Sequence, residues 1–183
     1  MFLRRFLFIS VLLASSVAAT AGGIDLNVRD EAVQLQYATS TPTATQVHVG
    51  FLNTKDHDWL ADWGLIVRGP LNFARMRAGV GLKAVGARLD HEEIAAIALG
   101  GELRLPLLPL SDRLALVARV YAAPNVITYG DGTRYLESGA RLEYELIPDA
   151  TVYIGYRRMT FDLETRSDAV LDSGFHAGLR LSF

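Results

Sequence analysis

Apolar and polar residues alternate along most of the chain from residue 22 onward. In the first such segment, Ile24, Leu26 and Val28 alternate with Asp25 and Asn27. A period of two is typical of β-strands, because successive side chains point to opposite faces of a sheet. The pattern predicts an all-β protein of about ten strands. Further alternations fall within residues 33–37, 45–51, 63–67, 74–82, 95–105, 114–120, 140–146, 152–156 and 175–183.

Two turns predict how neighbouring strands pair. A two-residue loop at Asp30-Glu31 pairs residue 24 with 37, 26 with 35 and 28 with 33, which puts six apolar side chains on one face. A four-residue turn at 69–72 pairs residue 67 with 74 and 68 with 73. The alanine-rich segment 92–100 fits a strand or a short helix, because short apolar runs are compatible with both periods.

The first residues have the three parts of a secretory signal peptide. Arg4 and Arg5 precede an apolar run over residues 6–17, and Ala19-Thr20-Ala21 forms an Ala-x-Ala cleavage site. We predict a signal peptide over residues 1–21, cleaved after Ala21, followed by one barrel domain over residues 22–183. Cleavage after Ala19 is the alternative. A membrane-anchoring helix is the competing interpretation, but the apolar run is shorter than the roughly 20 residues that span a bilayer.

The polar face of the predicted strands is rich in arginine, glutamate and glycine. Glycine weakens a strand unless a bend or a close approach requires it, and inside a narrow barrel it leaves room for long side chains. Enclosed charges must pair, because an unpaired one is costly. We therefore predict that this face lines a barrel lumen as a charge lattice of Asp62, Arg75, Arg77, Lys83, Glu102, Arg104, Arg119, Glu137, Arg141, Glu143, Glu145, Arg157 and Arg180.

Aromatic residues of the apolar face fall near the ends of the predicted strands. We predict one girdle at Tyr37, Tyr144 and Phe183, and a second towards the other rim at Phe51, Trp59, Trp63 and Phe175. Two aromatic girdles around an apolar band are typical of a transmembrane β-barrel in the outer membrane.

The connections between strands alternate in length. They are short at 39–43, 69–72, 105–112 and 148–150, and long at 53–58, 85–93, 123–135 and 163–172. Short turns at one rim and long loops at the other are the outer-membrane pattern. The short turn at Asp30-Glu31 breaks this pattern, which leaves open whether the first hairpin belongs to the wall and whether the barrel has eight or ten strands.

The chain ends in an alternating strand whose last residue is Phe183. In an up-and-down barrel the last strand pairs with the first, which removes all sheet edges. A terminal strand that ends in phenylalanine resembles the signal that outer-membrane barrels carry for their assembly machinery, and this resemblance implies that Phe183 is the signal residue.

Both ends of the predicted barrel resemble a known family. The start AGGIDLNVRDEAVQLQYA (residues 21–38) and the end GFHAGLRLSF (residues 174–183) resemble the YfaZ family of Gram-negative outer-membrane proteins. The segment Gly-Ile-Asp-Leu-Asn at 23–27 is the most specific match. The resemblance implies an outer-membrane barrel of poorly defined function, with no catalytic or ligand residues to carry over.

The sequence gives little support for other chemistry. The net charge of −2 argues against a nucleic-acid partner, and the absence of cysteine excludes a disulfide framework. Segments 56–58 and 90–93 fit solvated acidic loops better than metal sites. No distinctive spacing defines a catalytic triad among His48, His57, His91, His176, Ser167, Asp168, Asp172 and Ser173.

We therefore expect a protein that is not an enzyme and binds no cofactor. The expected function is that of an outer-membrane barrel with a narrow, charge-lined and mostly closed lumen, in a structural or surface-interaction role. The alternatives are a narrow pore for water, ions or small solutes and a soluble periplasmic, lipocalin-like ligand-binding barrel. The expected partners are outer-membrane lipid, lipopolysaccharide and the barrel assembly machinery, which reads the C-terminal strand. The sequence defines no oligomeric state.

Overall fold

The computed structural model describes residues 21–72, 75–89, 92–108, 111–163 and 169–183. Within these residues the chain forms ten long strands and no α-helix. The strands are β1 (Ala21–Val28), β2 (Ala32–Ser40), β3 (Thr45–Thr54), β4 (Trp59–Pro70), β5 (Arg77–Leu89), β6 (Glu92–Leu108), β7 (Ser111–Ala123), β9 (Gly132–Ile147), β10 (Ala150–Leu163) and β11 (Ala169–Ser182). The short strand β8 (Thr128–Gly130) follows a 3-10 turn at Asn125–Ile127 and pairs only with β6, while β7 pairs directly with β9.

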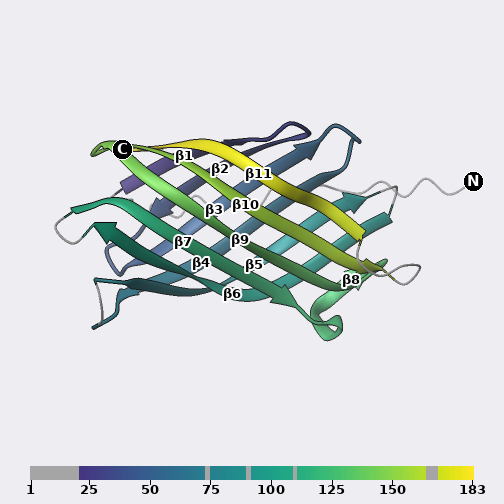
Figure 1. Ribbon diagram of the computed structural model, residues 1–183. Helices are drawn as coiled ribbons and strands as arrows, with labels where there is room; N and C mark the ends of the chain where they lie inside the picture. The colour runs from purple at the N-terminus through teal and green to yellow at the C-terminus, as the bar shows by residue number, and fades with distance from the viewer. Residues whose placement is uncertain (1–20, 73–74, 90–91, 109–110, 164–168) are drawn as a thin grey trace, which may run out of the picture.

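The ten long strands form a closed antiparallel barrel (Figure 1). Closure is made by β1 and β11, where Gly23 lies opposite Ser182 and Val28 opposite Ala177. The backbone N–H of Phe183 also donates to the carbonyl of Gly22 over 2.9 Å. The predicted all-β, up-and-down fold is confirmed. The strand number is ten rather than eight, because the first hairpin is part of the wall, and segment 92–100 is strand because it lies in β6.

The two ends of the barrel differ in what they carry. We call the end that holds Gly22 and Phe183 the terminal rim; it also carries the turns at 41–44 and 148–149, the end of β4 and the start of β5. We call the opposite end the distal rim; it carries the β1–β2 and β3–β4 loops and β8. In Figure 1 the C-terminus lies at the left, at the terminal rim, and β8 lies at the right.

One of the two predicted turn registers is confirmed and the other is wrong. Leu26 lies opposite Leu35 in the first hairpin, as predicted. In the β4–β5 hairpin, however, Val67 lies opposite Val80 rather than Ala74, a shift of six residues. An even shift keeps every side chain on its predicted face, so an alternation of period two cannot determine this register. The partners predicted here, residues 73 and 74, lie outside the described residues.

The predicted long loops are shorter than expected at the distal rim. Strand β5 continues to Leu89 and β6 begins at Glu92, so most of segment 85–93 is strand. Charged residues in this segment indicated a loop, because loops are usually polar and exposed. Arg88 nevertheless pairs with Trp59 on one side and Glu93 on the other, so the charged residues extend the wall at the rim.

The outward face of the barrel is apolar. Val80 is 72% exposed and Ile154 is 64% exposed. Soluble monomers seldom expose large continuous apolar surfaces. Other exposed members of this face are Ile24, Leu26, Val33, Leu35, Val49, Ile97, Leu99, Leu103, Leu116, Val120, Leu136, Leu142, Val170, Leu179 and Leu181. Among the described residues no helix is long and apolar enough to cross a membrane.

Candidate functional site

The interior of the barrel is divided into an apolar half and a polar half. The apolar half, which we call the distal seal, consists of inward-facing side chains at the distal ends of the strands. Its largest fully buried members are Tyr135 and Phe161, whose ring centroids lie 4.8 Å apart. They pack in one cluster with Ala32, Leu52, Leu60, Val85, Ala87, Leu89, Ile94, Ala96, Ala98, Tyr121, Ala123, Met159, Leu163, Ala169 and Leu171.

The distal seal was missed by the sequence analysis, which predicted a charged lumen throughout. Near the distal rim both faces of several strands are apolar, as in β6, where Ile94, Ala96 and Ala98 point inward between the outward-facing Ala95 and Ile97. A strand that is apolar on both faces has apolar surroundings on both sides. For β6 these are the buried cluster inside the barrel and the environment of the outward face. That loss of alternation was the signal for the seal.

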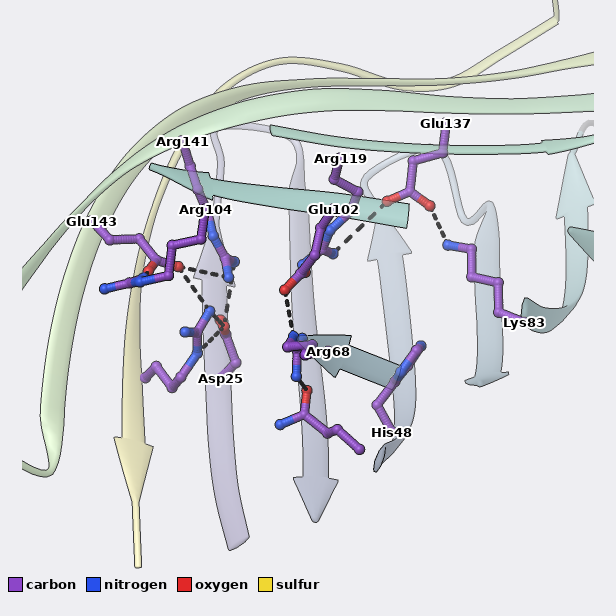
Figure 2. A network of polar contacts seen from close by, with 12 residues as sticks. Asp25, His48, Arg68, Lys83, Glu102, Arg104, Arg119, Glu137, Arg141 and Glu143 are labelled. Carbon is purple, nitrogen blue, oxygen red and sulfur yellow. Dashed lines mark hydrogen bonds and ion pairs between the residues drawn. The ribbon is translucent and has the colours of Figure 1, made fainter. Parts of the chain in front are cut away.

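The polar half contains two charge clusters, which are drawn in Figure 2. The terminal cluster consists of Asp25, Arg104, Arg141, Glu143 and Arg180. The Arg180 guanidinium donates to the Asp25 carboxylate and to Glu143, each over 3.1 Å. Arg141 bonds Glu143 over 2.8 Å and approaches Asp25 at 3.5 Å, while Arg104 donates to Glu143. Three guanidinium groups therefore share two carboxylates.

The central cluster consists of Arg68, Lys83, Glu102, Arg119 and Glu137. Arg68 donates to Glu102 over 2.6 Å, and Arg119 lies 3.8 Å from Glu102 and 3.9 Å from Glu137. Glu137 also accepts hydrogen bonds from Lys83 and, over 2.9 Å, from the hydroxyl of Tyr135. Since Tyr135 belongs to the distal seal, this contact joins the polar half to the apolar half.

A third group of charges, the seam cluster, lies near the closure of β1 with β11. Arg157 donates to Asp172 from Nε over 2.8 Å and to Gln34 from a terminal nitrogen. Arg29 lies 3.2 Å from Asp172 and donates to the backbone carbonyl of Ser173. This carbonyl belongs to the part of β11 that extends beyond Val28, the last β1 residue paired with it. The Arg29 side chain thus donates the hydrogen bond to this carbonyl that a paired residue of β1 would otherwise donate.

Glycines of the lumen face make the space for these side chains. A Cβ atom on Gly178 would lie 2.2 Å from the ring of Tyr153, whose hydroxyl donates to Asp25. A Cβ atom on Gly64 would lie 2.7 Å from both His48 and Lys83. Glycine at these positions therefore allows close approach of a long or aromatic side chain from a neighbouring strand.

A cavity of about 340 Å³ lies in the polar half of the lumen. Its lining includes residues of the terminal rim, among them Gly22, Ser40, Arg77 and Ser182. It also includes residues of both the terminal and the central clusters. The cavity thus extends from the terminal rim to the central cluster, and the distal seal occupies the opposite half of the interior.

The structure places the predicted lattice residues as follows. Lys83, Glu102, Arg104, Arg119, Glu137, Arg141, Glu143 and Arg180 lie in the terminal and central clusters, and Arg157 lies in the seam cluster. Asp62 is buried and lies 3.2 Å from Nε2 of His48. Arg77 lines the cavity at the terminal rim, and Glu145 is half-buried near the same end of β9.

Arg75 is not part of the lumen. It lies in the β4–β5 turn with a φ of 55° and forms a 3.1 Å ion pair with Asp112, in which both side chains are more than half exposed. The prediction was wrong because it began β5 at residue 74, whereas the strand begins at Arg77. Arg75 therefore belongs to the polar surface of the terminal rim.

Two residues were absent from the predicted lattice, one of the terminal cluster and one of the central cluster. Asp25 was not included, and the place of the first hairpin in the wall was left open, although its position between Ile24 and Leu26 was the available signal. Arg68 was not included; it was placed next to the predicted turn at 69–72, whereas β4 continues to Pro70. Asp25 already lay in a predicted strand, and a longer assignment of the strand that holds Val67 would have included Arg68.

The predicted girdle residues face outward. Tyr37, Phe51, Trp63, Tyr144, Phe175 and Phe183 are exposed. Trp59 is half-buried and stacks on Phe51 with 6.4 Å between ring centroids. Tyr156, which was not among the predicted girdle residues, also faces outward, and its ring centroid lies 5.3 Å from that of Phe175. Their arrangement as two girdles stays a prediction.

The histidines are placed in different surroundings. His48 pairs with Asp62, His176 lies edge-on to Tyr153, and His57 lies in the β3–β4 loop. Asp172 is engaged by Arg157 and Arg29, and Ser173 contacts the hydroxyl of Tyr156 at 3.0 Å. His91, Ser167 and Asp168 lie outside the described residues. Within the described part of the chain, no group of three or more His, Cys, Asp or Glu side chains is arranged to hold a metal ion.

These features define the class of the protein as a closed ten-stranded β-barrel with an apolar outer face and a charged, partly filled lumen. The family model for YfaZ, described as YfaZ precursor, matches residues 3–183. The chain therefore belongs to the YfaZ family, as the resemblance of its two ends indicated. A comparison with curated proteins gave no match.

Proposed function

We propose that the protein is an integral outer-membrane β-barrel of Gram-negative bacteria with a sealed lumen and a structural or surface-interaction role. The observation that carries this proposal is the apolar outer face of a barrel that has no open edge. Lipid chains provide the apolar surroundings that such a face requires. Closure of the barrel pairs the backbone N–H and carbonyl groups of every strand on both sides, as a membrane-spanning sheet requires. A soluble lipocalin-like barrel needs the opposite arrangement, with its apolar face inside.

The distal seal supports a closed lumen over a narrow pore. Ions and water cross an apolar constriction poorly, because such a segment dewets. Tyr135, Phe161, Leu52 and Leu60 are all fully buried within the seal. A path for water or ions would have to pass between these side chains or along the paired charges of the seam cluster, where Gln34 lies opposite Leu52 and Asp172 opposite Met159, so the pore is the weaker alternative.

The orientation of the barrel follows from its termini. We assign the terminal rim to the periplasmic side and the distal rim to the cell surface, because the termini of outer-membrane barrels and their short turns face the periplasm. Cleavage of the signal peptide after Ala21 leaves Gly22 as the first residue, where it still pairs with Phe183. The proposed partners are the lipids and lipopolysaccharide around the wall. We propose neither an enzymatic activity nor a cofactor.

Deleting Phe183 tests the proposed assembly signal. We expect the amount of folded protein in the outer membrane to fall at least several-fold, because the terminal ring is what the assembly machinery would bind and Phe183 also pairs with Gly22. The measurement is immunoblotting of outer-membrane fractions for the truncated and complete chains.

Phe175→Ala is the matched control for this deletion, since Phe175 lies on the same strand and is also exposed. It should leave the outer-membrane level nearly unchanged. Equal levels of the truncated and complete chains would contradict the role given to Phe183.

A further inference from the structure

We propose that the lumen cavity is a binding site for a small, hydrophilic oxyanion that carries phosphate or carboxylate groups and enters from the terminal rim. This inference goes beyond the proposed structural role, which needs only that the charges pair with one another. It rests on the charge, the exposure and the accessibility of the side chains that line the cavity.

The lining of the cavity is basic although the whole chain is acidic. Seven basic and five acidic residues line it, so its net charge is +2 with His48 neutral. The whole chain carries a net charge of −2. The basic residues are Arg68, Arg77, Lys83, Arg104, Arg119, Arg141 and Arg180, and the acidic ones are Asp25, Asp62, Glu102, Glu137 and Glu143.

The guanidinium groups are also the more accessible partners in the ion pairs. Glu137 and Glu143 are only 1% exposed, so their carboxylates lie behind the groups that bind them. The more accessible arginines have side-chain exposures of 25–30%; these are Arg68, Arg104, Arg119 and Arg180. A solute in the cavity would therefore meet guanidinium groups before carboxylates.

The excess charge lies within each cluster rather than at one isolated residue. The terminal cluster holds three arginines against Asp25 and Glu143, and the central cluster holds three basic residues against Glu102 and Glu137. An enclosed charge without a counter-charge is costly. A lattice that served only to fill the barrel would be most stable when balanced, so the surplus indicates a counter-ion from outside.

The size and the neutral lining of the cavity narrow the class of ligand. A volume of about 340 Å³ lies at the lower end of the range for small-molecule sites. Gln34, Gln36, Gln46 and Ser40 supply neutral hydrogen-bonding groups beside the arginines. Guanidinium groups bind phosphate and carboxylate in preference to other anions, because their planar donors match two oxygens at once. The site therefore fits a phosphorylated or carboxylated molecule of about the size of a monosaccharide.

Access to the site is from the terminal rim. Gly22, Ser182 and the exposed Arg77 line the cavity at that end, and the distal seal occupies the other end of the lumen. Arg77 stands opposite Arg104 on the neighbouring strand, which makes the entrance basic as well. A ligand held here is reached from one side of the membrane only.

Calorimetric titration of the folded protein in a nonionic detergent tests this inference. The probes are inorganic phosphate, citrate and glucose 6-phosphate, with glucose as the uncharged comparison. We expect saturable binding of at least one anion, weaker at high salt, and no binding of glucose. Arg180→Gln should weaken that binding at least tenfold, and Arg180→Lys should weaken it less, because lysine keeps the charge.

Arg134→Gln is the matched control, because Arg134 lies at the distal end of β9 and pairs with Asp162 outside the cavity lining. It should bind the anion like the wild type, and a heat-shifted gel band would establish that each variant is folded. The inference is overturned if the folded wild type binds none of the anions, or if Arg180→Gln binds as well as the wild type. Binding of phosphatidylglycerol in mixed micelles, without binding of any soluble anion, would overturn the assignment to a soluble ligand. None of these results depends on where the barrel resides in the cell.

Discussion

Replacing Glu137 with alanine is expected to lower the free energy of unfolding by about 3–5 kcal/mol, the usual cost of removing one partner of a buried ion pair. Glu137 is 1% exposed and binds Lys83, Tyr135 and Arg119. Its loss leaves Lys83 buried beside two aromatic rings, 5.0 Å from the ring centroid of Tyr121 and 5.5 Å from that of Tyr135, with no other ion pair to a carboxylate among the described residues. Urea unfolding of the refolded barrel in lipid vesicles measures the change.

Glu31→Ala is the control for this substitution. Glu31 also pairs with an arginine, Arg29, over 3.6 Å, but its side chain is 65% exposed. Exposed pairs contribute little, so we expect a change below about 1 kcal/mol. Adding Lys83→Met to Glu137→Ala should recover part of the lost stability, because it removes the unpaired ammonium group. Equal destabilisation by Glu31→Ala and Glu137→Ala would contradict the account of the central cluster.

Opening the distal seal is expected to turn a silent barrel into a conducting one. Leu60 and Phe161 are both fully buried in the seal, on β4 and β10. Replacing both with asparagine puts polar groups into the constriction, allows water to enter and removes the barrier that dewetting creates. In planar bilayer recordings the wild type should give no current steps, and the double variant should give discrete steps.

The control for the seal is Val126→Asn, which makes the same kind of change at a residue that is 82% exposed on the 3-10 turn. It should stay silent. A retained heat-shifted band would establish that the double variant is still a closed barrel. Discrete steps from the wild type would contradict a sealed lumen, and silence of the folded double variant would contradict the assignment of the barrier to these side chains.

The alternation of residues predicted the wall of the barrel well because each strand has two chemically different faces. Ile24, Leu26 and Val28 face outward, while Asp25 and Asn27 face the lumen. Alternation distinguishes only registers that differ by an odd number of residues, because an even shift leaves every side chain on the same face. The pairing of Val67 with Val80 could therefore not be derived from it.

The composition of the lumen was predicted in part. Arginine and glutamate at inward positions predicted that opposite charges would pair in the lumen, but not which pairs would form, such as Arg104 with Glu143. That depends on the order of strands around the closed wall. The distal seal was missed because the predicted strands ended at residues 51 and 156, so Leu52 and Phe161 were assigned to no face, although both are buried inside the barrel.

The most direct test of whether the protein is a closed barrel in the outer membrane is heat-modifiability of the complete protein in a membrane fraction. Unboiled and boiled samples are compared by detergent gel electrophoresis. A closed ten-stranded barrel in the outer membrane predicts a band in the outer-membrane fraction that shifts on boiling, because the hydrogen-bonded wall resists detergent until heated. A single unshifted band in the soluble periplasmic fraction would contradict the account.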